Sequence, residues 1–266
     1  MTQFSNSVIV ITGASSGIGR ALAIELAPQS PKLVLAARNR TRLDEVSAAC
    51  QQLGAETLVV PTDVTVEAQC RELVERAAAH FGGVNVLVSN AGRAMWTRFD
   101  TLTDLSIMED VMRLNYLGSV YCTFHALPHL KQSRGLIVGV ASISGLIGAP
   151  LLSGYSASKH AVIGFYDSLR IELKKTGVGV TVIAPDFVQS EILELAIGPD
   201  GRPIGESPLD QKTLLSAEAC ARRIVKAMSR RERLALTSFR SGWARWGQLL
   251  APKLVDRIVA ASVGSR

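Results

Sequence analysis

Short apolar runs alternate along the chain with longer stretches in which apolar residues recur at three- and four-residue spacing. The runs are typical of buried strands, and they lie at 8–11, 32–37, 57–64, 84–89, 135–141 and 178–184, with a shorter one at 234–237. The stretches between them predict helices, most clearly at 66–80, 108–130, 155–173 and 217–228. Strands that alternate with helices predict an α/β fold with a doubly wound parallel sheet.

The pattern changes twice towards the C-terminus. Residues 1–238 carry every predicted strand, and their apolar content is enough for one large domain with a single core. Within this domain, residues 186–215 are rich in glycine, proline and polar side chains. We interpret this segment as a mobile flap over the site.

Residues 239–266 form a basic, amphipathic helical tail. Trp243, Trp246 and Leu250 are among its apolar residues, and basic residues lie between them. Pro252 fits the first turn of a second helix. We favour packing of the tail on its own domain or on a partner subunit. Contact with a membrane surface through 240–262 and a cover over the substrate mouth are the alternatives.

Composition narrows the class of protein. The 266 residues carry a net charge of +6, but the basic residues are spread along most of the chain without a nucleic-acid-binding motif, so we expect no nucleic-acid partner. The four cysteines are scattered without a CxxC pair, which indicates free thiols in a reducing compartment. No signal-peptide pattern opens the chain. We therefore expect a cytoplasmic protein, with membrane association through the tail as the alternative.

Two stretches imitate other kinds of site. Residues 135–158 hold no charge and are long enough to span a bilayer, but their serines, proline and glycines fit a buried strand and a loop better. His125 and His129 lie four residues apart in a predicted helix and resemble a metal-binding pair. Pro128 intervenes and no third ligand is evident, so we expect no metal.

A glycine-rich turn, TGASSGIG at 12–19, joins the first predicted strand to a helix. Glycines let the backbone approach a pyrophosphate, and a helix N-terminus offers unpaired N–H groups and a positive dipole end. The Gly-x3-Gly-x-Gly spacing differs from the general G-x-G-x-x-G fingerprint. The turn predicts a Rossmann-type dinucleotide site with contacts at Gly13, Ser15, Ser16, Gly17, Ile18 and Gly19.

The second predicted strand ends at Arg38, and the next acidic residue is Asp44, inside the following helix. A domain that selects NAD usually carries an acidic residue at this strand end for the ribose 2′-hydroxyl. A guanidinium there suits a 2′-phosphate, which it can bind with two hydrogen bonds. The sequence therefore predicts NADP(H) as the cofactor.

Polar and small residues follow several other predicted strands. Ligands of doubly wound sheets bind outside the carboxyl ends of the strands. The residues at these ends are Asp63 and Val64, then Asn90, Ala91 and Gly92, then Ser142, then Pro185. Asp63 is suited to accept from the adenine amino group, with Val64 packed on the ring. These residues predict one cofactor site along a single edge of the sheet.

Tyr155 and Lys159 are four residues apart at the start of a predicted helix. Positions i and i+4 share one face of a helix, so a phenol and an ammonium would lie side by side. A nearby positive charge favours the phenolate and lowers the tyrosine pKa from about 10 towards neutrality. The pair is a candidate for acid–base chemistry.

In this order, these residues resemble the short-chain dehydrogenase/reductase family over about residues 6–237. The matching pieces are TGASSGIG at 12–19, Asp63-Val64, Asn-Ala-Gly at 90–92, Asn115, Ser142 and YSASK at 155–159. The resemblance implies hydride transfer between NADP(H) and a carbonyl/alcohol substrate, with Tyr155 as general acid or base. It also implies cofactor contacts from Pro185 and Val188, and a homodimer or homotetramer.

The resemblance also implies roles for the residues around Tyr155. Lys159 would lower the Tyr155 pKa and bind the nicotinamide ribose. Ser142 would bind the substrate oxygen, and Asn115 would hold a water molecule that links Lys159 to solvent. Asp186 departs from the pattern, because the family often has glycine after this proline.

The substrate is the least defined part of the prediction. The tail is loosely similar to that of the branch of the family that contains the 11β-hydroxysteroid dehydrogenases, and we expect a lipophilic small molecule. A 3-oxoacyl-thioester reductase is the first alternative. A dinucleotide-binding protein without substantial turnover is the second, although the intact set of Asn115, Ser142, Tyr155 and Lys159 argues against it.

Overall fold

The computed structural model describes residues 3–263, without the side chains of residues 239–241, 244, 262 and 263. Its centre is a seven-stranded parallel sheet with the strand order β3-β2-β1-β4-β5-β6-β7. The strands are β1 (Val8–Thr12), β2 (Lys32–Ala37), β3 (Glu56–Pro61), β4 (Val86–Ser89), β5 (Leu136–Val140), β6 (Gly179–Ala184) and β7 (Leu234–Leu236). The predicted α/β fold with a parallel, doubly wound sheet is confirmed.

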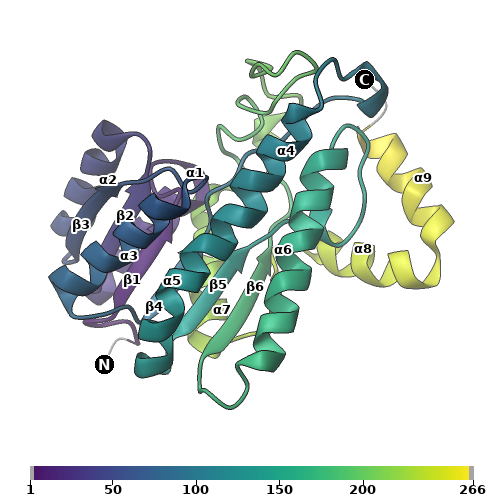
Figure 1. The fold of residues 1–266 in the computed structure, drawn as a ribbon. Coiled ribbons are helices and arrows are strands. Elements are labelled where there is room, and N and C mark those ends of the chain that lie inside the picture. The colour runs from purple at the N-terminus through teal and green to yellow at the C-terminus, as the bar shows by residue number, and fades with distance from the viewer. Residues whose placement is uncertain (1–2, 264–266) are drawn as a thin grey trace.

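Helices cover both faces of the sheet (Figure 1). One layer contains α1 (Gly17–Leu26), α2 (Arg40–Gln52) and α7 (Ala217–Arg230), and the other contains α3 (Glu67–Phe81), α5 (Gly118–Ser133) and α6 (Ser153–Glu172). Residues of β1 alternate between the two cores, with Ile9 and Ile11 in the first and Val8 and Val10 in the second. Burial on both faces explains why the central strands are continuously apolar.

The stretch predicted as one helix over 108–130 is helical throughout but not uniform. It consists of α4 (Ser106–Met112), a π-helical turn over Arg113–Leu117, and α5. A π-turn inside a helical stretch is uncommon and is frequent at functional sites. Asn115 lies in this turn, where its side chain hydrogen-bonds the backbone of Arg93.

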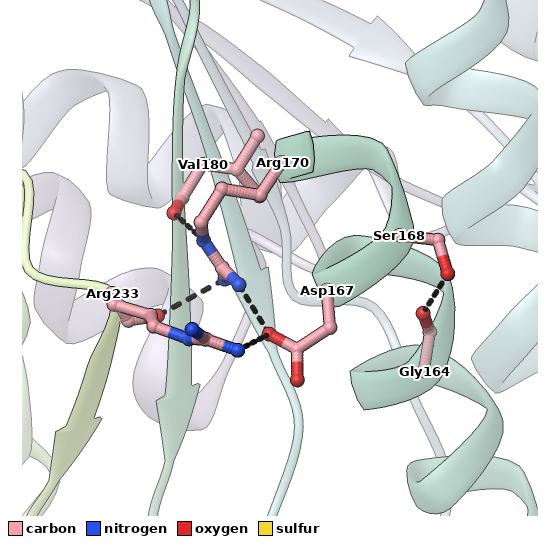
Figure 2. Close-up of polar contacts among 6 residues, drawn as sticks. All are labelled: Gly164, Asp167, Ser168, Arg170, Val180 and Arg233. Carbon is pink, nitrogen blue, oxygen red and sulfur yellow. Dashed lines mark hydrogen bonds and ion pairs between the residues drawn. The ribbon is translucent and has the colours of Figure 1, made fainter. Parts of the chain in front are cut away.

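A cluster of charged side chains fixes the C-terminal half of α6 against the sheet (Figure 2). The Arg170 guanidinium donates to the carbonyl oxygens of Val180 on β6 (3.0 Å) and Arg233 (3.1 Å), and it forms an ion pair with Asp167. Arg233 lies 3.5 Å from the same Asp167 carboxylate. The helix that begins with Tyr155 and Lys159 is therefore tied to β6 and to the chain that enters β7.

Residues 186–215 form a long loop whose only helical part among its described residues is a short turn at Gln211–Thr213. Backbone hydrogen bonds join its two ends, from the Gln189 N–H to the Leu215 oxygen at 2.8 Å. Its middle is joined to the segment after β4, where the Ile197 N–H donates to the Ala94 oxygen at 3.0 Å. The predicted loop is present, and its mobility stays a prediction.

The tail forms two helices, α8 (Phe239–Leu250) and α9 (Pro252–Val263), which extend away from the sheet and its helices (Figure 1). Its apolar side chains are largely exposed, including Trp243, Trp246, Leu249, Leu250, Leu254 and Ile258. These side chains do not pack on the tail's own domain in the structure, and the expected packing of the tail on its own domain or on a partner subunit stays a prediction. None of the helices in the described part of the chain is long and apolar enough to cross a bilayer.

Candidate active site

A cavity of about 790 Å³ opens outside the carboxyl ends of the strands. Most of the predicted site residues line it: Gly13, Ser15, Ser16, Gly17, Ile18, Arg38, Asp63, Val64, Asn90, Ala91, Gly92, Ser142, Tyr155, Lys159, Pro185 and Val188. Gly19 and Asn115 are buried next to this lining. The structure therefore brings residues from the whole length of the sheet into one cleft.

The glycine turn forms one wall of the cleft. Gly13 and Gly17 have φ angles of +66° and +51°, a backbone conformation that residues with a Cβ rarely adopt. A Cβ at Gly19 would overlap the Gly13 carbonyl oxygen, so the turn can close only with glycine there. Ser16 precedes α1 without capping it through its side chain, which leaves the first-turn N–H groups of α1 for an anion.

The segment after β4 supports this turn. The Thr12 hydroxyl accepts from the backbone N–H groups of Asn90 (2.9 Å) and Ala91 (3.1 Å). The Asn90 side-chain amide donates to the Thr12 carbonyl oxygen at 2.9 Å. Asn90 thus holds two strand ends together, and the cradle fits a dinucleotide pyrophosphate.

Arg38 and the start of α2 form the far end of the cleft. Asn39 caps α2, because its side-chain oxygen accepts from the Arg42 N–H at 3.1 Å. Arg42 lines the cavity with Arg38, and so does Arg93 further along. Arg42 and Arg93 were not predicted from the sequence, because only the folded chain brings them to this cleft.

Asp63 is fixed by its own turn at the same end of the cleft. One of its carboxylate oxygens accepts from the Thr65 N–H (2.9 Å) and the Thr65 hydroxyl (2.7 Å). Its backbone N–H donates to the Gln69 side chain at 2.7 Å. The carboxylate is oriented before any ligand binds, which suits the predicted contact with an adenine amino group.

Tyr155 and Lys159 lie side by side on α6, with the Lys159 ammonium 5.7 Å from the centre of the Tyr155 ring. The ammonium donates to the Val140 carbonyl oxygen at 2.9 Å. Burial without an opposing carboxylate lowers the pKa of Lys159 to about 8. The predicted i, i+4 arrangement is therefore present, and the lysine is poised to titrate near neutrality.

The Tyr155 pKa differs from the sequence-based expectation. Removal of the phenol from water raises the pKa of Tyr155 above its usual value, and a hydrogen bond with the Ser142 hydroxyl lowers it in part. The expected lowering of the Tyr155 pKa by Lys159 is therefore wrong, because desolvation of the phenol has the largest effect on this pKa. The phenol is accordingly held in its protonated form, which is the form that can donate a proton.

Ser142 follows β5 by two residues, and its hydroxyl forms a hydrogen bond with the Tyr155 phenol. Its hydroxyl accepts from the Ser144 N–H at 3.2 Å, which caps a short helical turn. The turn also holds α6 closely, because a Cβ on Gly145 would lie 2.7 Å from the Lys159 carbonyl oxygen. Ser142 and Tyr155 are thus positioned by the same packing.

The Asn115 side chain connects the segment after β4 to α6. Its amide oxygen accepts from the Arg93 N–H (2.8 Å), and its amide nitrogen donates to the Arg93 oxygen (3.0 Å) and to the Ser158 hydroxyl (2.9 Å). The side chain is 1 % exposed. Asn115 therefore fixes the chain after Gly92 to α6, and its predicted role in holding a water stays a prediction.

Asp186 connects the cleft to the segment between β7 and α8. Its carboxylate accepts from the Ser238 hydroxyl at 2.8 Å and from the Phe187 N–H at 2.9 Å, and its own N–H donates to the Thr237 hydroxyl at 2.9 Å. The side chain that stands in place of the family's usual glycine is thus a structural link between the ends of β6 and β7. The sequence gives no signal of this contact.

The other candidate sites have ordinary structural roles. His125 lies 3.2 Å from Glu67 of α3. Within residues 3–263, no three His, Cys, Asp or Glu side chains gather closely enough to hold a metal ion. The four cysteines are free and buried, as predicted.

Comparison with known proteins identifies the family. The model of the family described as short chain dehydrogenase matches residues 7–196. The chain therefore belongs to the short-chain dehydrogenase family, and it is an oxidoreductase of that family.

The chain is similar to several plant proteins along most of its length. It is 36 % identical over 263 residues to the 11-beta-hydroxysteroid dehydrogenase 1A of Arabidopsis thaliana, covering 94 % of this chain and 73 % of the relative. It is 40 % identical over 239 residues to the 11-beta-hydroxysteroid dehydrogenase-like 6 of the same plant, covering 87 % of this chain and 70 % of the relative.

Solved structures share the fold. A short-chain dehydrogenase/reductase from Burkholderia phymatum in complex with NAD has a TM-score of 0.84 at 27 % identity and covers 96 % of both chains. An alcohol dehydrogenase from Thermococcus sibiricus complexed with 5-hydroxy-NADP has a TM-score of 0.74 at 26 % identity, covering 86 % of this chain and 94 % of its own. A nicotinamide dinucleotide cofactor is thus typical of the family, in both its NAD and NADP forms.

Proposed function

We propose that this protein is an NADP(H)-dependent oxidoreductase that interconverts a lipophilic carbonyl compound and its alcohol. One observation carries the proposal: Tyr155, Lys159 and Ser142 converge at one end of a cleft whose other end is a dinucleotide cradle with an arginine at its rim. The proton-transfer group and the cofactor cradle therefore belong to a single cavity.

The residues at this end of the cleft have separate tasks in carbonyl reduction. The nicotinamide, when bound, supplies the hydride. The Tyr155 hydroxyl gives its proton to the substrate oxygen, and the Ser142 hydroxyl donates a hydrogen bond to the same oxygen. Both interactions strengthen as that oxygen gains negative charge, so they favour the transition state over the bound substrate.

Lys159 supports this proton transfer. Its ammonium stabilises the phenolate that remains on Tyr155 and binds the nicotinamide ribose. Asn115 positions α6 through Ser158, and through its water it returns a proton from solvent. Alcohol oxidation uses the same groups in reverse, with the Tyr155 phenolate as the base.

The choice of NADP(H) rests on Arg38. It lines the cleft directly after β2, at the strand end where a dinucleotide-binding sheet meets the adenosine ribose. A guanidinium pairs well with a phosphate and has no advantage for a bare ribose hydroxyl. NADP(H) should therefore support a higher kcat/KM than NAD(H) in both reaction directions.

The choice of a lipophilic substrate rests on the cavity wall and on the relatives. Apolar side chains line the cavity that contains Tyr155, among them Ile143, Leu152, Ile192 and Leu193. Transfer of an apolar ligand from water onto such a wall is favourable. The plant relatives are named for hydroxysteroids, so a rigid, largely apolar ketone with few polar groups is the substrate class that we propose.

A turnover assay tests the proposal. The purified chain is mixed with NADPH and a panel of ketosteroids and other apolar ketones, and NADPH oxidation is followed. Ketone-dependent oxidation supports the proposal. Activity confined to 3-oxoacyl thioesters would favour the alternative reductase. Tight NADPH binding without turnover of any ketone, alcohol or thioester would favour a dinucleotide-binding protein.

The exposed tail supports a second part of the proposal. Trp243, Trp246 and Leu250 present apolar surface to solvent, and Lys253 and Arg257 accompany them. We propose that the tail contacts an anionic membrane surface while the rest of the chain remains in the cytoplasm. Full-length protein should sediment with anionic vesicles more than with neutral ones, and a chain that ends at Ser238 should not. Equal recovery of both chains would contradict this.

A second exposed apolar surface, outside the tail, is compatible with self-association. We propose a homodimer or homotetramer that uses the outer faces of the helices holding Asn115 and Tyr155, where Phe124 and Ile171 are exposed apolar side chains. Light scattering during size-exclusion chromatography measures the mass directly. Phe124→Asp should shift it towards the monomer, and a wild-type monomer would contradict the proposal.

A further inference from the structure

A short part of the long loop crosses the mouth of the cofactor cleft. Residues 190–193, which we name the strap, line the same cavity as the glycine turn and the start of α2. A Cβ on Gly17 would lie 3.2 Å from the Ser190 Cβ, so the strap passes directly over the glycine turn. A dinucleotide in this cleft would have the strap as its neighbour.

The strap is anchored on both sides. Before it, the Gln189 N–H donates to the Leu215 oxygen at 2.8 Å, and the Leu215 N–H donates to the Phe187 oxygen at 3.3 Å. After it, the Arg93 side chain donates to the Leu195 carbonyl oxygen at 3.1 Å. Between these anchors, an ion pair from Glu191 to Arg42 ties the strap across the cleft to α2.

The ion pair is short and open to solvent. The Arg42 guanidinium lies 2.6 Å from the Glu191 carboxylate, and the two side chains are 47 % and 43 % exposed. Arg42 belongs to the first turn of α2, four residues after Arg38, and both arginines line the cavity. Glu191 is therefore paired with the Arg42 guanidinium, at the end of the cleft where Arg38 would bind a 2′-phosphate.

We propose that the 2′-phosphate of NADP(H) displaces Glu191 from Arg42, so that this ion pair couples the choice of cofactor to release of the strap. The proposal rests on the NADP(H) preference proposed above. A phosphate carries more negative charge and more acceptor oxygens than a carboxylate, and a solvent-exposed ion pair is weak, so the exchange favours the phosphate. NAD(H) has only a hydroxyl at this position and leaves the pair intact.

Glu191 then acts as a specificity-determining residue because Arg42 holds its charge near the position of the 2′-phosphate. Beside a bound 2′-phosphate, a carboxylate held on the strap would face a like charge. Leaving Arg42 removes that repulsion and frees the strap between its two anchors. The adenosine end of the cofactor thus controls a part of the loop whose Ile192 and Leu193 line the same cavity as Tyr155.

Binding of NADPH and NADH to four variants tests the exchange. Arg42→Gln should weaken NADPH binding by about tenfold, and Glu191→Gln should tighten it by about two- to fivefold. Neither should change NADH binding. Arg40→Gln and Asp44→Asn are matched controls, because Arg40 and Asp44 form an exposed pair 3.6 Å apart on the same helix outside the cavity lining. Both controls should bind NADPH like the wild type.

The double variant Arg42→Gln/Glu191→Gln separates partner exchange from simple repulsion. If Glu191 acts by occupying Arg42, the double variant should bind NADPH as weakly as Arg42→Gln alone. An equal gain from Glu191→Gln with and without Arg42 would overturn the exchange. So would a Glu191→Gln variant that binds NADPH as the wild type does or more weakly.

The same titrations distinguish this inference from the proposed function. A wild-type chain that prefers NADPH and loses that preference in Arg38→Asp, but not in Arg42→Gln, would overturn the exchange and leave the NADP(H) assignment standing. A wild-type chain that binds NADH as tightly as NADPH would overturn the NADP(H) assignment itself.

Discussion

The cleft and the tail are built in opposite ways. In the cleft, polar side chains are held by named partners: Asn115 bonds Arg93 and Ser158, and Lys159 bonds the Val140 oxygen. In α8 and α9, large apolar side chains such as Leu250 and Trp243 are 82 % and 68 % exposed. The polar side chains of the cleft are therefore paired within the chain, whereas the tail leaves large apolar side chains exposed. Removal of a single polar group in the cleft should therefore change activity strongly. Substitutions in the tail should hardly change the free energy of unfolding.

The largest expected effect follows from removing the proton donor. Tyr155→Phe deletes one hydroxyl and should lower kcat for ketone reduction by about 10²- to 10⁴-fold, since that is the usual contribution of general acid catalysis. The dissociation constant for NADPH should stay within about twofold, because no cofactor cradle group is removed. Steady-state kinetics and a fluorescence titration measure the two quantities. Near-normal turnover would show that Tyr155 is not the acid.

A leucine-to-alanine substitution in the sheet and another in the tail compare how much each region contributes to stability. Leu87 in β4 is fully buried, and Leu250 in α8 is 82 % exposed. Leu87→Ala should lower the free energy of unfolding by about 2–5 kcal/mol, and Leu250→Ala should change it by less than about 0.5 kcal/mol. Urea denaturation measures both. A large loss in Leu250→Ala would mean that the tail packs on the domain in solution.

The anchor of α6 should have an intermediate effect on stability. Arg170→Met removes the hydrogen bonds to the Val180 and Arg233 oxygens and leaves Asp167 without this partner, so unfolding should be easier by about 1–3 kcal/mol. Ser168→Ala is the control, because Ser168 is exposed and donates only within α6, to the Gly164 oxygen (Figure 2). Equal denaturation midpoints for the two variants would show that the cluster does not anchor the helix.

The smallest expected effect on activity near neutral pH is the loss of the Lys159 proton. Burial lowers its pKa to about 8, so the ammonium is present below that pH and is lost as the pH rises through it. Ketone reduction needs the ammonium, and its kcat/KM should therefore fall about tenfold per pH unit above this value. A pH profile measures the fall. A flat profile well above pH 8 would show that the ammonium persists or is not required.

The sequence was a good guide where local chemistry decides the structure. Parallel strands need apolar runs, and the turn at Gly13 and Gly19 needs residues without a Cβ, so both features are visible in the residue pattern. Spacing alone placed Tyr155 and Lys159 on one face of α6. Ligands of doubly wound sheets bind outside the carboxyl ends of the strands, so the remaining site residues were also predicted to lie along one edge of the sheet.

The sequence was a poor guide where the outcome depends on distant contacts or on solvent. Arg42 and Glu191 are 149 positions apart, and neither residue carries a local signal of the pair. The Tyr155 pKa depends on how much water the folded chain removes, which spacing does not report. The tail's amphipathic pattern predicted its two helices correctly, but it did not show that their large apolar side chains are exposed.

The most direct test of the account is a parallel fluorescence titration of the wild-type chain and Arg38→Asp with NADPH and NADH. The wild type should bind NADPH clearly more tightly than NADH, and Arg38→Asp should abolish or reverse the difference while both proteins remain folded. An unchanged preference in Arg38→Asp would contradict the role of Arg38 in reading the 2′-phosphate. Binding of neither cofactor by the folded wild-type chain would contradict the assignment of the cleft as a dinucleotide site.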